Sequence, residues 1–302
     1  MPPPPVTSRS LPSYAVSSVA GQGNRAQVVG LSIAGSDPSG GAGIQADLKT
    51  FAALGAYGTT VVTALTAQST TGVTGVHPVP AQFVREQLET LLDDVPVDAV
   101  KVGMLGSAEV VDVVASVLGE HPALVAVVDG AGVQVPIVLD PVMVSTSGSR
   151  LLEPEAEDAL RRLLRIADVV TPNLPEAAVL LGAESARDLA EMRAQAAALH
   201  DLGARRVLLK GGHLDGPESV DVWSDAESGE VVELTSRRVR TANTHGTGCT
   251  LSSAIAALRP RHDEWLPAVR AAKDYLTGAL EHADDLTIGA GPGPVNHAWL
   301  ID

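Results

Sequence analysis

The chain has 302 residues, 45% hydrophobic and only 3% aromatic, so it is long enough to bury a full core of mainly aliphatic side chains. Its formal charge of −15 disfavours polyanionic partners such as nucleic acid or an anionic membrane surface. The single cysteine, Cys249, excludes an intramolecular disulfide and a zinc cluster built on cysteines, which fits a reducing compartment.

The first segment, residues 1–27, begins Met-Pro-Pro-Pro-Pro and continues rich in Ser, Gly, Ala and Gln. This composition predicts a disordered tail or a start-site extension. The segment does not combine a basic region with a long apolar stretch, so no secretory signal is expected. No run in the chain approaches the roughly 18 consecutive apolar residues of a membrane span. We therefore expect a cytoplasmic protein that does not contact membranes.

From Val28 onward, short β-branched runs alternate with longer stretches rich in Ala and Leu, and this alternation predicts a parallel sheet covered by helices on both faces. The predicted strands are Val28–Ile33, Thr59–Thr63, Ala99–Val102, Leu124–Val128 or alternatively Ile137–Leu139, Val169–Thr171 and Val207–Lys210. The predicted helices are Ala46–Leu54, Pro80–Asp93, Ala108–Leu118, Pro154–Leu164, Pro175–Leu181 and Ser185–Leu202.

The C-terminal third adds an antiparallel hairpin and two helices. Val220–Trp223 and Val231–Leu234 predict the hairpin, and the helices are predicted at Thr250–Ala257 and Leu266–Ala283. No fixed-period repeat and no internal linker divides the sequence, so we predict one domain over residues 28–302. Ligands of open α/β sheets bind beyond the carboxyl ends of the strands, which directs attention to the loops that follow each strand.

The first such loop is the glycine-rich segment 34–47. Its Gly41–Ala46 matches the dinucleotide fingerprint G-x-G-x-x-A, but Leu48–Val84 contains no acid that could hold a ribose, so NAD binding is excluded. The P-loop pattern is absent as well. Two interpretations stay open: a tight turn that lets the next helix pack closely, or a loop whose backbone approaches a small ligand. In the second, Asp47 hydrogen-bonds the ligand from the first helical turn.

The second segment, residues 243–250, reads Asn-Thr-His-Gly-Thr-Gly-Cys-Thr and continues into a predicted helix. Amides at a helix start lack backbone acceptors and carry the positive end of the helix dipole, so this segment predicts an anion site. Cys249 lies at the same N-terminus, where the helix field favours a thiolate. Neither a Gly-x-Ser-x-Gly turn nor a metal-binding histidine spacing occurs, which excludes a serine hydrolase and a zincin.

Both segments resemble motifs of the ribokinase-like superfamily, in which Gly-Thr-Gly before an Ala-rich helix forms an anion hole. Cys249, where that superfamily usually has Asp, resembles the subgroup of hydroxymethylpyrimidine and hydroxymethylpyrimidine phosphate kinases, together with some related pyridoxal kinases. The resemblance extends in order from Val28 to His297. Further matching segments are Thr66–Gln68, Lys101–Leu105, Leu139–Met143, Thr171–Ala177 and Leu209–His213.

The resemblance implies a ribokinase-like α/β fold and a pocket for a pyrimidine ring. Asp47 and Gln68 are implied to hold the ring, since a carboxylate and an amide can pair with the adjacent donors and acceptors of an aminopyrimidine. Gly35, Ala42 and Met104 are implied to shape the pocket. Without the resemblance, Asp47 is a first-turn helix acid, Gln68 a polar strand-end residue and Met104 a core filler.

The same resemblance assigns the phosphate chemistry to polar residues that follow strands. Asp140 and Glu176 are implied to organise Mg²⁺, directly or through water, and Asn173 and Lys210 to contact the phosphates of ATP. Taken alone, Asp140 is a turn-forming acid and Glu176 a solvated charge at a helix start. The implied cradle for the transferring phosphoryl group consists of Gly246, Thr247, Gly248 and Cys249. Cys249 is further implied to accept or to orient the proton of the substrate hydroxyl.

Two segments depart from the family pattern. Ser145–Ser149 reads Ser-Thr-Ser-Gly-Ser where the family often has Ala-Lys-Ser-Gly-Asp, so a lysine and an aspartate are missing. Asp129–Val135 has the character of an insertion, and we expect a surface loop without a chemical role there. His213 and His245 lie inside family motifs and are expected near the nucleotide.

The resulting hypothesis is an ATP-dependent and Mg²⁺-dependent kinase that phosphorylates hydroxymethylpyrimidine, and then its monophosphate, in thiamin biosynthesis. Pyridoxal kinase is the nearest alternative, because it shares the fold and the cysteine-type anion hole. A catalytically silent ligand-binding or regulatory protein is the alternative from another class, and the intact set of acids, Lys210 and Cys249 argues against it. The resemblance also implies a homodimer.

Overall fold

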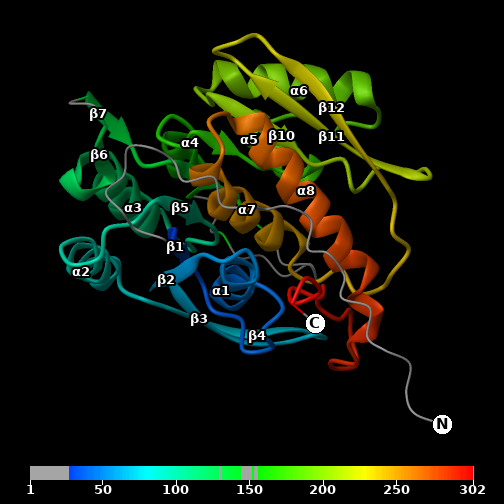
Figure 1. Ribbon diagram of the computed structural model, residues 1–302, viewed down its shortest axis with the longest axis horizontal. Helices are drawn as coiled ribbons and strands as arrows, with labels where there is room; N and C mark the ends of the chain where they lie inside the picture. The colour runs from blue at the N-terminus through cyan, green and yellow to red at the C-terminus, as the bar shows by residue number, and fades with distance from the viewer. Residues whose placement is uncertain (1–26, 129–130, 144–151, 153–155, 302) are drawn as a thin grey trace.

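The computed structural model describes residues 27–128, 131–143, 152 and 156–301. Its central sheet has eight strands in the order β12-β11-β10-β9-β8-β5-β1-β2 (Figure 1). All pairs from β2 to β10 are parallel, and β11 and β12 add an antiparallel edge. The strands are β1 (Val29–Ala34), β2 (Tyr57–Val62), β5 (Ala99–Val102), β8 (Ile137–Leu139), β9 (Val169–Val170), β10 (Arg206–Leu209), β11 (Glu218–Asp225) and β12 (Val231–Arg237).

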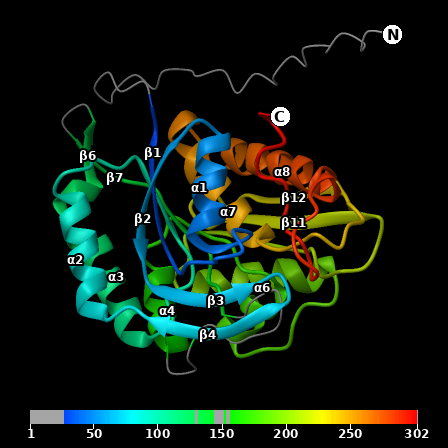
Figure 2. The same ribbon diagram turned by 90° about the horizontal axis from the view of Figure 1, so that it is seen from below.

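Helices cover both faces of this sheet, as the alternating pattern predicts (Figures 1 and 2). One face carries α1 (Gly43–Ala53), α7 (Thr247–Leu258) and α8 (Trp265–Glu281). The other face carries α2 (Ala81–Leu92), α3 (Ala108–Glu120), α4 (Ala156–Leu164), α5 (Leu174–Leu181) and α6 (Leu189–Asp201). Short 3₁₀ turns occur at Pro122–Leu124, Arg259–Arg261 and Ala283–Asp285. The predicted α/β class with a mostly parallel sheet is confirmed.

The two faces are built from alternate residues of the central strands, because successive side chains of a strand point to opposite sides. In β10, Val207 and Leu209 pack with the helices from α2 to α6, and Leu208 packs with α1, α7 and α8. Burial on both faces explains why the parallel strands are nearly continuous runs of apolar residues. Lys101, a charged residue inside the apolar run of β5, is fully buried.

One hairpin of the structure was not among the predicted elements. β3 (Ala64–Ser69) and β4 (Gly72–Pro78) form a two-stranded sheet that is separate from the eight-stranded sheet and lies below α1 in Figure 1. In β3 buried and exposed positions alternate, which is the pattern of a sheet with one covered face. Its covered side brings Thr66 and Gln68 towards the carboxyl end of β1.

The structure decides between the two alternative strands, Leu124–Val128 and Ile137–Leu139, and shows a second hairpin. Ile137–Leu139 is the sheet strand, inserted between β5 and β9. The alternative segment forms β6 (Val125–Val128), which pairs antiparallel with β7 (Ala131–Gln134) outside the main sheet. The expectation of a surface loop over Asp129–Val135 is therefore wrong for β7, because its backbone groups pair with β6 instead of with water.

Several predictions fall outside the described residues. These include the disordered tail, except for its last residue, and the Ser145–Ser149 loop. The single domain over residues 28–302 stays a prediction. Within the described residues, no helix combines the length and the apolar character that crossing a membrane requires.

Candidate active site

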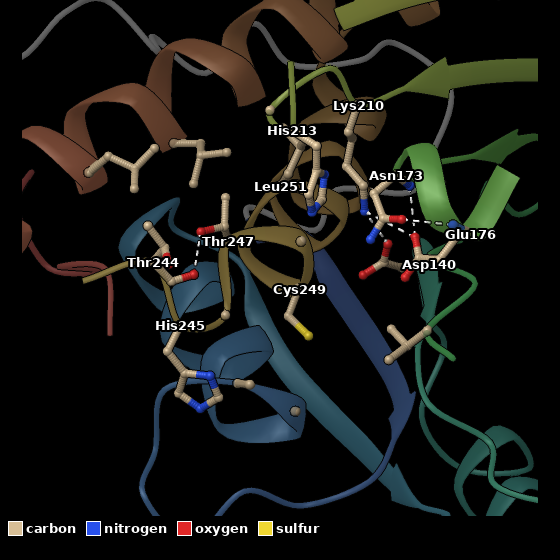
Figure 3. Close-up of a pocket in the computed structure, with 18 of the residues that line it drawn as sticks. Asp140, Asn173, Glu176, Lys210, His213, Thr244, His245, Thr247, Cys249 and Leu251 are labelled. Atoms are coloured by element: carbon tan, nitrogen blue, oxygen red, sulfur yellow. Dashed lines mark hydrogen bonds and ion pairs between the residues drawn. The ribbon is translucent and has the colours of Figure 1, made fainter. Parts of the chain in front are cut away.

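A cavity of about 650 Å³ opens at the carboxyl edge of the parallel strands. Its walls come from the loops that follow β1, β5, β8, β9 and β10 and from the first turn of α7. Figure 3 shows acidic and basic side chains on one wall, His245 on the other and Cys249 between them. The volume is in the range that suits a ligand of nucleotide size.

The predicted anion-binding part of the cavity is the start of α7, where Gly246 has a positive φ of 80°. A Cβ at this position would lie 1.7 Å from the Gly41 carbonyl oxygen, so only glycine allows the loop after β1 to pack against α7. Thr247, Gly248 and Cys249 form the first turn. The Thr247 amide donates to the Thr244 carbonyl at 3.3 Å, and helix geometry provides no intrahelical acceptor for the amides of Gly248 and Cys249. All four predicted cradle residues line the cavity.

The charged wall gathers four predicted residues from three neighbouring strands. Lys210 Nζ lies 2.8 Å from Asp140 Oδ1 and 3.9 Å from Glu176 Oε2. Asn173 caps α5 by accepting from the Glu176 amide at 2.8 Å, and Glu176 Oε2 accepts from the Asn173 amide at the same distance. The sheet order places the carboxyl ends of β8, β9 and β10 side by side, which is why residues far apart in sequence meet.

The charge balance on this wall suits a cation. Burial raises the pKa of Glu176 to about 7, with Lys210 opposing the rise and Asp140 adding to it. Two buried carboxylates share one ammonium, so an additional positive charge at this wall would relieve their repulsion. Carboxylate oxygens are ligands that Mg²⁺ prefers, and the ion usually keeps water and phosphate oxygens as its other ligands. In line with this open arrangement, the described residues contain no cluster of three or more acidic, His or Cys side chains that would enclose a metal alone.

The Cys249 thiol lies at the start of α7 between the two walls (Figure 3). Burial raises the pKa of this thiol to about 11, Lys101 and the Gly43 backbone N–H lower it, and Asp47 and Asp140 raise it further. The expectation that a thiolate is favoured at this helix start is therefore wrong, because burial, the largest influence on this pKa, disfavours the charged form. At neutral pH the thiol is mainly protonated.

The other end of the cavity contains the predicted ring pocket. Gly35, Ala42, Gln68 and Met104 all line it. A Cβ at Gly35 would lie 2.4 Å from Met104 Cε, so the glycine leaves the room that the methionine occupies. The Met104 carbonyl accepts from Thr63 Oγ1 at 2.6 Å, which fixes the loop after β5. The four residues come from two loops, after β1 and after β5, and from the hairpin strand β3.

The residue pair Asp37 and His245 joins the two ends, and the sequence analysis did not identify Asp37. His245 Nε2 donates to Asp37 Oδ2 at 2.7 Å, and this carboxylate also accepts from the Ala42 amide at 2.8 Å. Burial would raise the pKa of Asp37, but hydrogen bonds from His245, Ser39 and Ala42 lower it to about 2. His245 Nε2 lies 3.5 Å from Gln68 Nε2, so His245 also borders the ring pocket, and its expected position near the nucleotide stays a prediction.

The predicted role of Asp47 is corrected by the structure. Its side chain is fully buried and does not line the cavity. Its carboxylate accepts from Lys101 Nζ at 2.8 Å, from Ser32 Oγ at 2.5 Å and from Ser253 Oγ at 2.6 Å. These contacts use both oxygens, so no acceptor is left for a ring. A charged residue in the buried run Ala99–Val102 was the sequence signal for such a partner, because a buried lysine needs a counter-ion.

Beyond Lys210 the cavity continues along β11, β12 and α8. Here Asp221 accepts from Lys273 Nζ at 2.6 Å and from the Gly211 amide at 2.9 Å, which holds the loop after β10 in place. His213 lines this part of the cavity, and burial together with Lys210 lowers its pKa. Its expected position near the nucleotide stays a prediction. Leu276 and Leu280 of α8 give this end an apolar side.

Comparison with known proteins gives a consistent picture. A family model described as phosphomethylpyrimidine kinase matches residues 37–296. A relative from Salmonella typhimurium named hydroxymethylpyrimidine/phosphomethylpyrimidine kinase is 51% identical over 272 residues, which are 89% of this chain and 97% of the relative.

Solved structures with the same fold include two named kinases. The ADP complex of a pyridoxal kinase from Bacillus subtilis superposes with a TM-score of 0.80 at 36% identity, covering 91% of this chain and 99% of that one. A phosphomethylpyrimidine kinase from Clostridium difficile superposes with a TM-score of 0.70 at 38% identity, covering 84% of this chain and 100% of that one. The predicted ribokinase-like fold is confirmed by these matches.

Proposed function

Because this chain belongs to the phosphomethylpyrimidine kinase family, we propose that it transfers the γ-phosphoryl group of ATP to hydroxymethylpyrimidine and then to the resulting monophosphate, in thiamin biosynthesis. The observation that carries the proposal is a single cavity with an anion-binding helix start in its middle, a charged wall on one side and a small ring pocket on the other. Such a cavity can hold a nucleotide and an alcohol end to end.

ATP is assigned as the phosphoryl donor because the family consists of kinases and a similar solved structure contains ADP. We assign the triphosphate to Asn173, Lys210 and the amides of Gly246–Cys249. Lys210 supplies a positive charge on one side of the transferring group and the start of α7 supplies N–H donors on the other. In phosphoryl transfer the protein mainly positions the reactants and offsets charge, and both contributions do this.

Asp140 and Glu176 would hold Mg²⁺ at the charged wall. The bound ion would neutralise phosphate charge. The two carboxylates are positioned without it, since Lys210 contacts Asp140 and the α5 capping box fixes Glu176.

The alcohol is assigned to the pocket of Gly35, Ala42, Gln68 and Met104. Gln68 Oε1 accepts from Thr66 Oγ1 at 3.2 Å, and His245 Nε2 donates to Asp37, so the Gln68 amide N–H groups remain as donors to a ring nitrogen. Met104 packs against one side of the ring. With Asp47 excluded, Gln68 is the side chain that recognises the ring.

The reaction itself forms one bond and breaks one. The substrate hydroxyl oxygen bonds to the γ-phosphorus, the bond from that phosphorus to the bridging oxygen of ADP breaks, and the hydroxyl proton ends on an oxygen of the new phosphate ester. Cys249 orients the hydroxyl as a neutral thiol, because its pKa of about 11 leaves little thiolate at neutral pH. A loose transition state needs no strong base at this point.

Replacement of Cys249 tests this assignment. Cys249→Ser keeps a hydrogen-bonding group, so we expect kcat within about tenfold of the parent, whereas Cys249→Ala loses about 10²-fold. A thiolate base predicts the opposite pattern: the serine variant is as inactive as alanine, and parental kcat rises about tenfold per pH unit towards the thiol pKa. Initial rates between about pH 6 and pH 9 distinguish the two.

Pyridoxal kinase is the second candidate, supported by the fold shared with the Bacillus subtilis enzyme. A coupled assay that offers hydroxymethylpyrimidine, its monophosphate and pyridoxal separately decides between them. Turnover of both pyrimidines is the expected result. Turnover of pyridoxal alone contradicts the proposed substrate and leaves the assigned kinase chemistry intact. Absence of turnover with all three contradicts the kinase assignment.

The remaining features are assigned by resemblance and charge. We infer a homodimer in the cytoplasm that uses small-molecule substrates. The net charge of −15 disfavours nucleic acid and anionic membranes as partners.

A further inference from the structure

A fully enclosed ion pair lies behind the active-site cysteine and is not used by the chemistry described above. Lys101 Nζ of β5 lies 2.8 Å from both carboxylate oxygens of Asp47 in α1, and neither side chain is exposed. Neither residue lines the cavity. Placing two charges in the interior requires desolvation that their attraction only partly offsets, so the pair calls for a reason beyond stability.

The sequence provides a specific pocket for this pair. Ser32 of β1 is the register partner of Lys101, and both point to the sheet face that carries α1 and α7. A Cβ at Gly103 would lie 2.7 Å from Lys101 Nζ, so the glycine leaves room for the ammonium. Ser32 and Ser253 donate to one Asp47 oxygen each, at 2.5 and 2.6 Å. The carboxylate is fully satisfied without solvent.

Two helix starts connect the pair to the thiol. The Gly43 N–H, at the start of α1, hydrogen-bonds the Cys249 side chain, and Asp47 follows one turn later on the same face. Cys249 lies at the start of α7, and Ser253 follows one turn later on the same face. Since Ser253 donates to Asp47, both helices contact the pair about 6 Å along their axes from the thiol.

We propose that Lys101 and Asp47 are positioning residues for Cys249: together they fix the start of α7 against α1 and β5, and their opposite charges offset each other at the thiol, so that the thiol keeps the neutral, hydrogen-bonding form that its burial favours. This inference rests on the proposed role of Cys249 in orienting the substrate hydroxyl. It assigns a role to two family-motif residues that do not line the cavity.

The charges around the thiol predict whether each substitution raises or lowers the pKa of Cys249. The positive charges of Lys101 in β5 and Lys210 in the charged wall favour a thiolate at Cys249. The negative charges of Asp47 in α1 and Asp140 after β8 disfavour it. Loss of Lys101 therefore makes the thiol harder to ionise. Loss of the Asp47 charge leaves an uncompensated ammonium that makes ionisation easier. A nearby unit charge commonly shifts a pKa by about 1 to 3 units, and one unit is a tenfold change in thiolate.

The test uses the fact that Cys249 is the only cysteine, so alkylation of the full chain reports on this thiol alone. Iodoacetamide reacts with the thiolate, and its rate at about pH 9 is followed by intact mass. Asp47→Asn should raise the rate about tenfold, and Lys101→Met should lower it about tenfold. The double variant, in which both charges are gone, should fall within about threefold of the parent.

A second buried pair is the matched control. Arg206 Nε lies 2.8 Å from Asp225 Oδ2 at the start of β10, at the opposite end of that strand from Lys210. Arg206→Met and Asp225→Asn should leave the alkylation rate within about twofold. Circular dichroism identifies any unfolded variant, whose exposed thiol would react faster whichever charge was removed.

If Lys101→Met does not fold, Asp47→Asn and the double variant carry the test. Asp47→Asn must still react faster than the double variant by about tenfold. Equal rates in the folded variants, or shifts in the same direction, overturn the proposal. Because alkylation needs neither ATP nor an alcohol, this outcome is independent of whether the proposed kinase activity is found. Parallel steady-state assays should show a lower kcat for Asp47→Asn with an unchanged KM for ATP.

Discussion

Two lysine–aspartate pairs in this molecule have the same separation and opposite surroundings. Lys101 and Asp47 lie 2.8 Å apart with no exposed side-chain surface, and Lys210 and Asp140 lie 2.8 Å apart at the wall of the cavity. The enclosed pair has a full set of hydrogen bonds, whereas the cavity pair shares its ammonium with a second carboxylate, Glu176. The distance between two charges therefore does not identify their role; the remaining partners and the access to ligand do.

The largest expected difference between the pairs concerns stability. Asp47→Ala leaves the Lys101 ammonium buried without a counter-ion and should lower the free energy of unfolding by about 3–5 kcal/mol. Asp140→Ala should change it by less than about 1 kcal/mol, because Lys210 keeps Glu176 as a partner and has access to solvent through the cavity. Urea unfolding of both variants, followed by circular dichroism, measures the two values.

Equal losses in the two variants contradict this comparison. Asp47→Asn is the control for shape, since it keeps the size of the side chain and one of the two oxygens that accept from Ser32 and Ser253, and it removes the charge. Its loss should lie between those of the two alanine variants.

The second difference concerns activity, and here the larger loss is expected for the cavity pair. Lys210→Met removes the charge that we assign to the ATP phosphates and should lower kcat/KM for ATP by about 10²- to 10³-fold. The Lys101→Met/Asp47→Asn double variant removes both enclosed charges and should lower it by less than about tenfold. Initial rates at varied ATP concentration give both numbers. A double variant as inactive as Lys210→Met would mean that the enclosed pair takes part in binding or chemistry.

The two pairs also show which parts of the site the sequence predicts. Asp140, Asn173, Glu176 and Lys210 were expected together, and the structure brings them together because the carboxyl ends of adjacent parallel strands share one edge. The family resemblance supplied this expectation, and the alternation of strands and helices predicted only that the loops after the strands lie at one edge of the sheet. Strand and helix positions were predicted within a few residues, since periodic burial is a local property of the chain.

The enclosed pair could not be predicted in the same way. The buried Asp47 carboxylate has its hydrogen-bond partners far away in sequence: Lys101 is 54 positions away and Ser253 is 206 positions away. No local sequence pattern links these residues. The pKa of Cys249 likewise depends on how deeply α7 is packed, which a helix-start motif does not encode. The β3–β4 hairpin escaped prediction because its turn residues, Thr70 and Thr71, are not the usual turn formers.

The third difference is a dependence on pH that only the cavity pair should show. Burial raises the pKa of Glu176 to about 7, well above its ordinary value, so the folded state binds a proton that the unfolded state has released between about pH 4.5 and pH 7. The stability contributed by this group is therefore lost as the pH rises through that window. The Glu176→Gln variant lacks this pH-dependent loss. Its free energy of unfolding relative to that of the parent should therefore be about 3 kcal/mol higher at about pH 8 than at about pH 4.5.

Urea unfolding of parent and Glu176→Gln at both pH values measures this gain. Gln keeps an oxygen that accepts from the Asn173 amide, so the α5 capping box is preserved. A difference between the two proteins that does not change with pH would show that Glu176 titrates normally. The Lys101→Met/Asp47→Asn variant should show no pH-dependent difference across the same window.

The smallest expected difference concerns the glycine that borders each pair. A Cβ at Gly103 would lie 2.7 Å from Lys101 Nζ and 3.1 Å from Ala34 Cβ. A Cβ at Gly248 would lie 3.2 Å from Lys210 Nζ and 3.3 Å from Asp140 Oδ2. The first ammonium is enclosed and cannot move away, whereas the second borders the cavity and can.

Gly103→Ala should therefore lower the free energy of unfolding by about 1 kcal/mol, since overpacking forces an enclosed side chain out of place. Gly248→Ala should leave it unchanged or raise it by up to about 1 kcal/mol, because alanine is the better helix former in α7. The new methyl group enters the space assigned to the transferring phosphoryl group, so kcat should fall about tenfold in Gly248→Ala alone. Urea unfolding and initial rates on the two variants complete the comparison. A stability loss in Gly248→Ala as large as that in Gly103→Ala would show that the cavity wall is as rigidly packed as the interior.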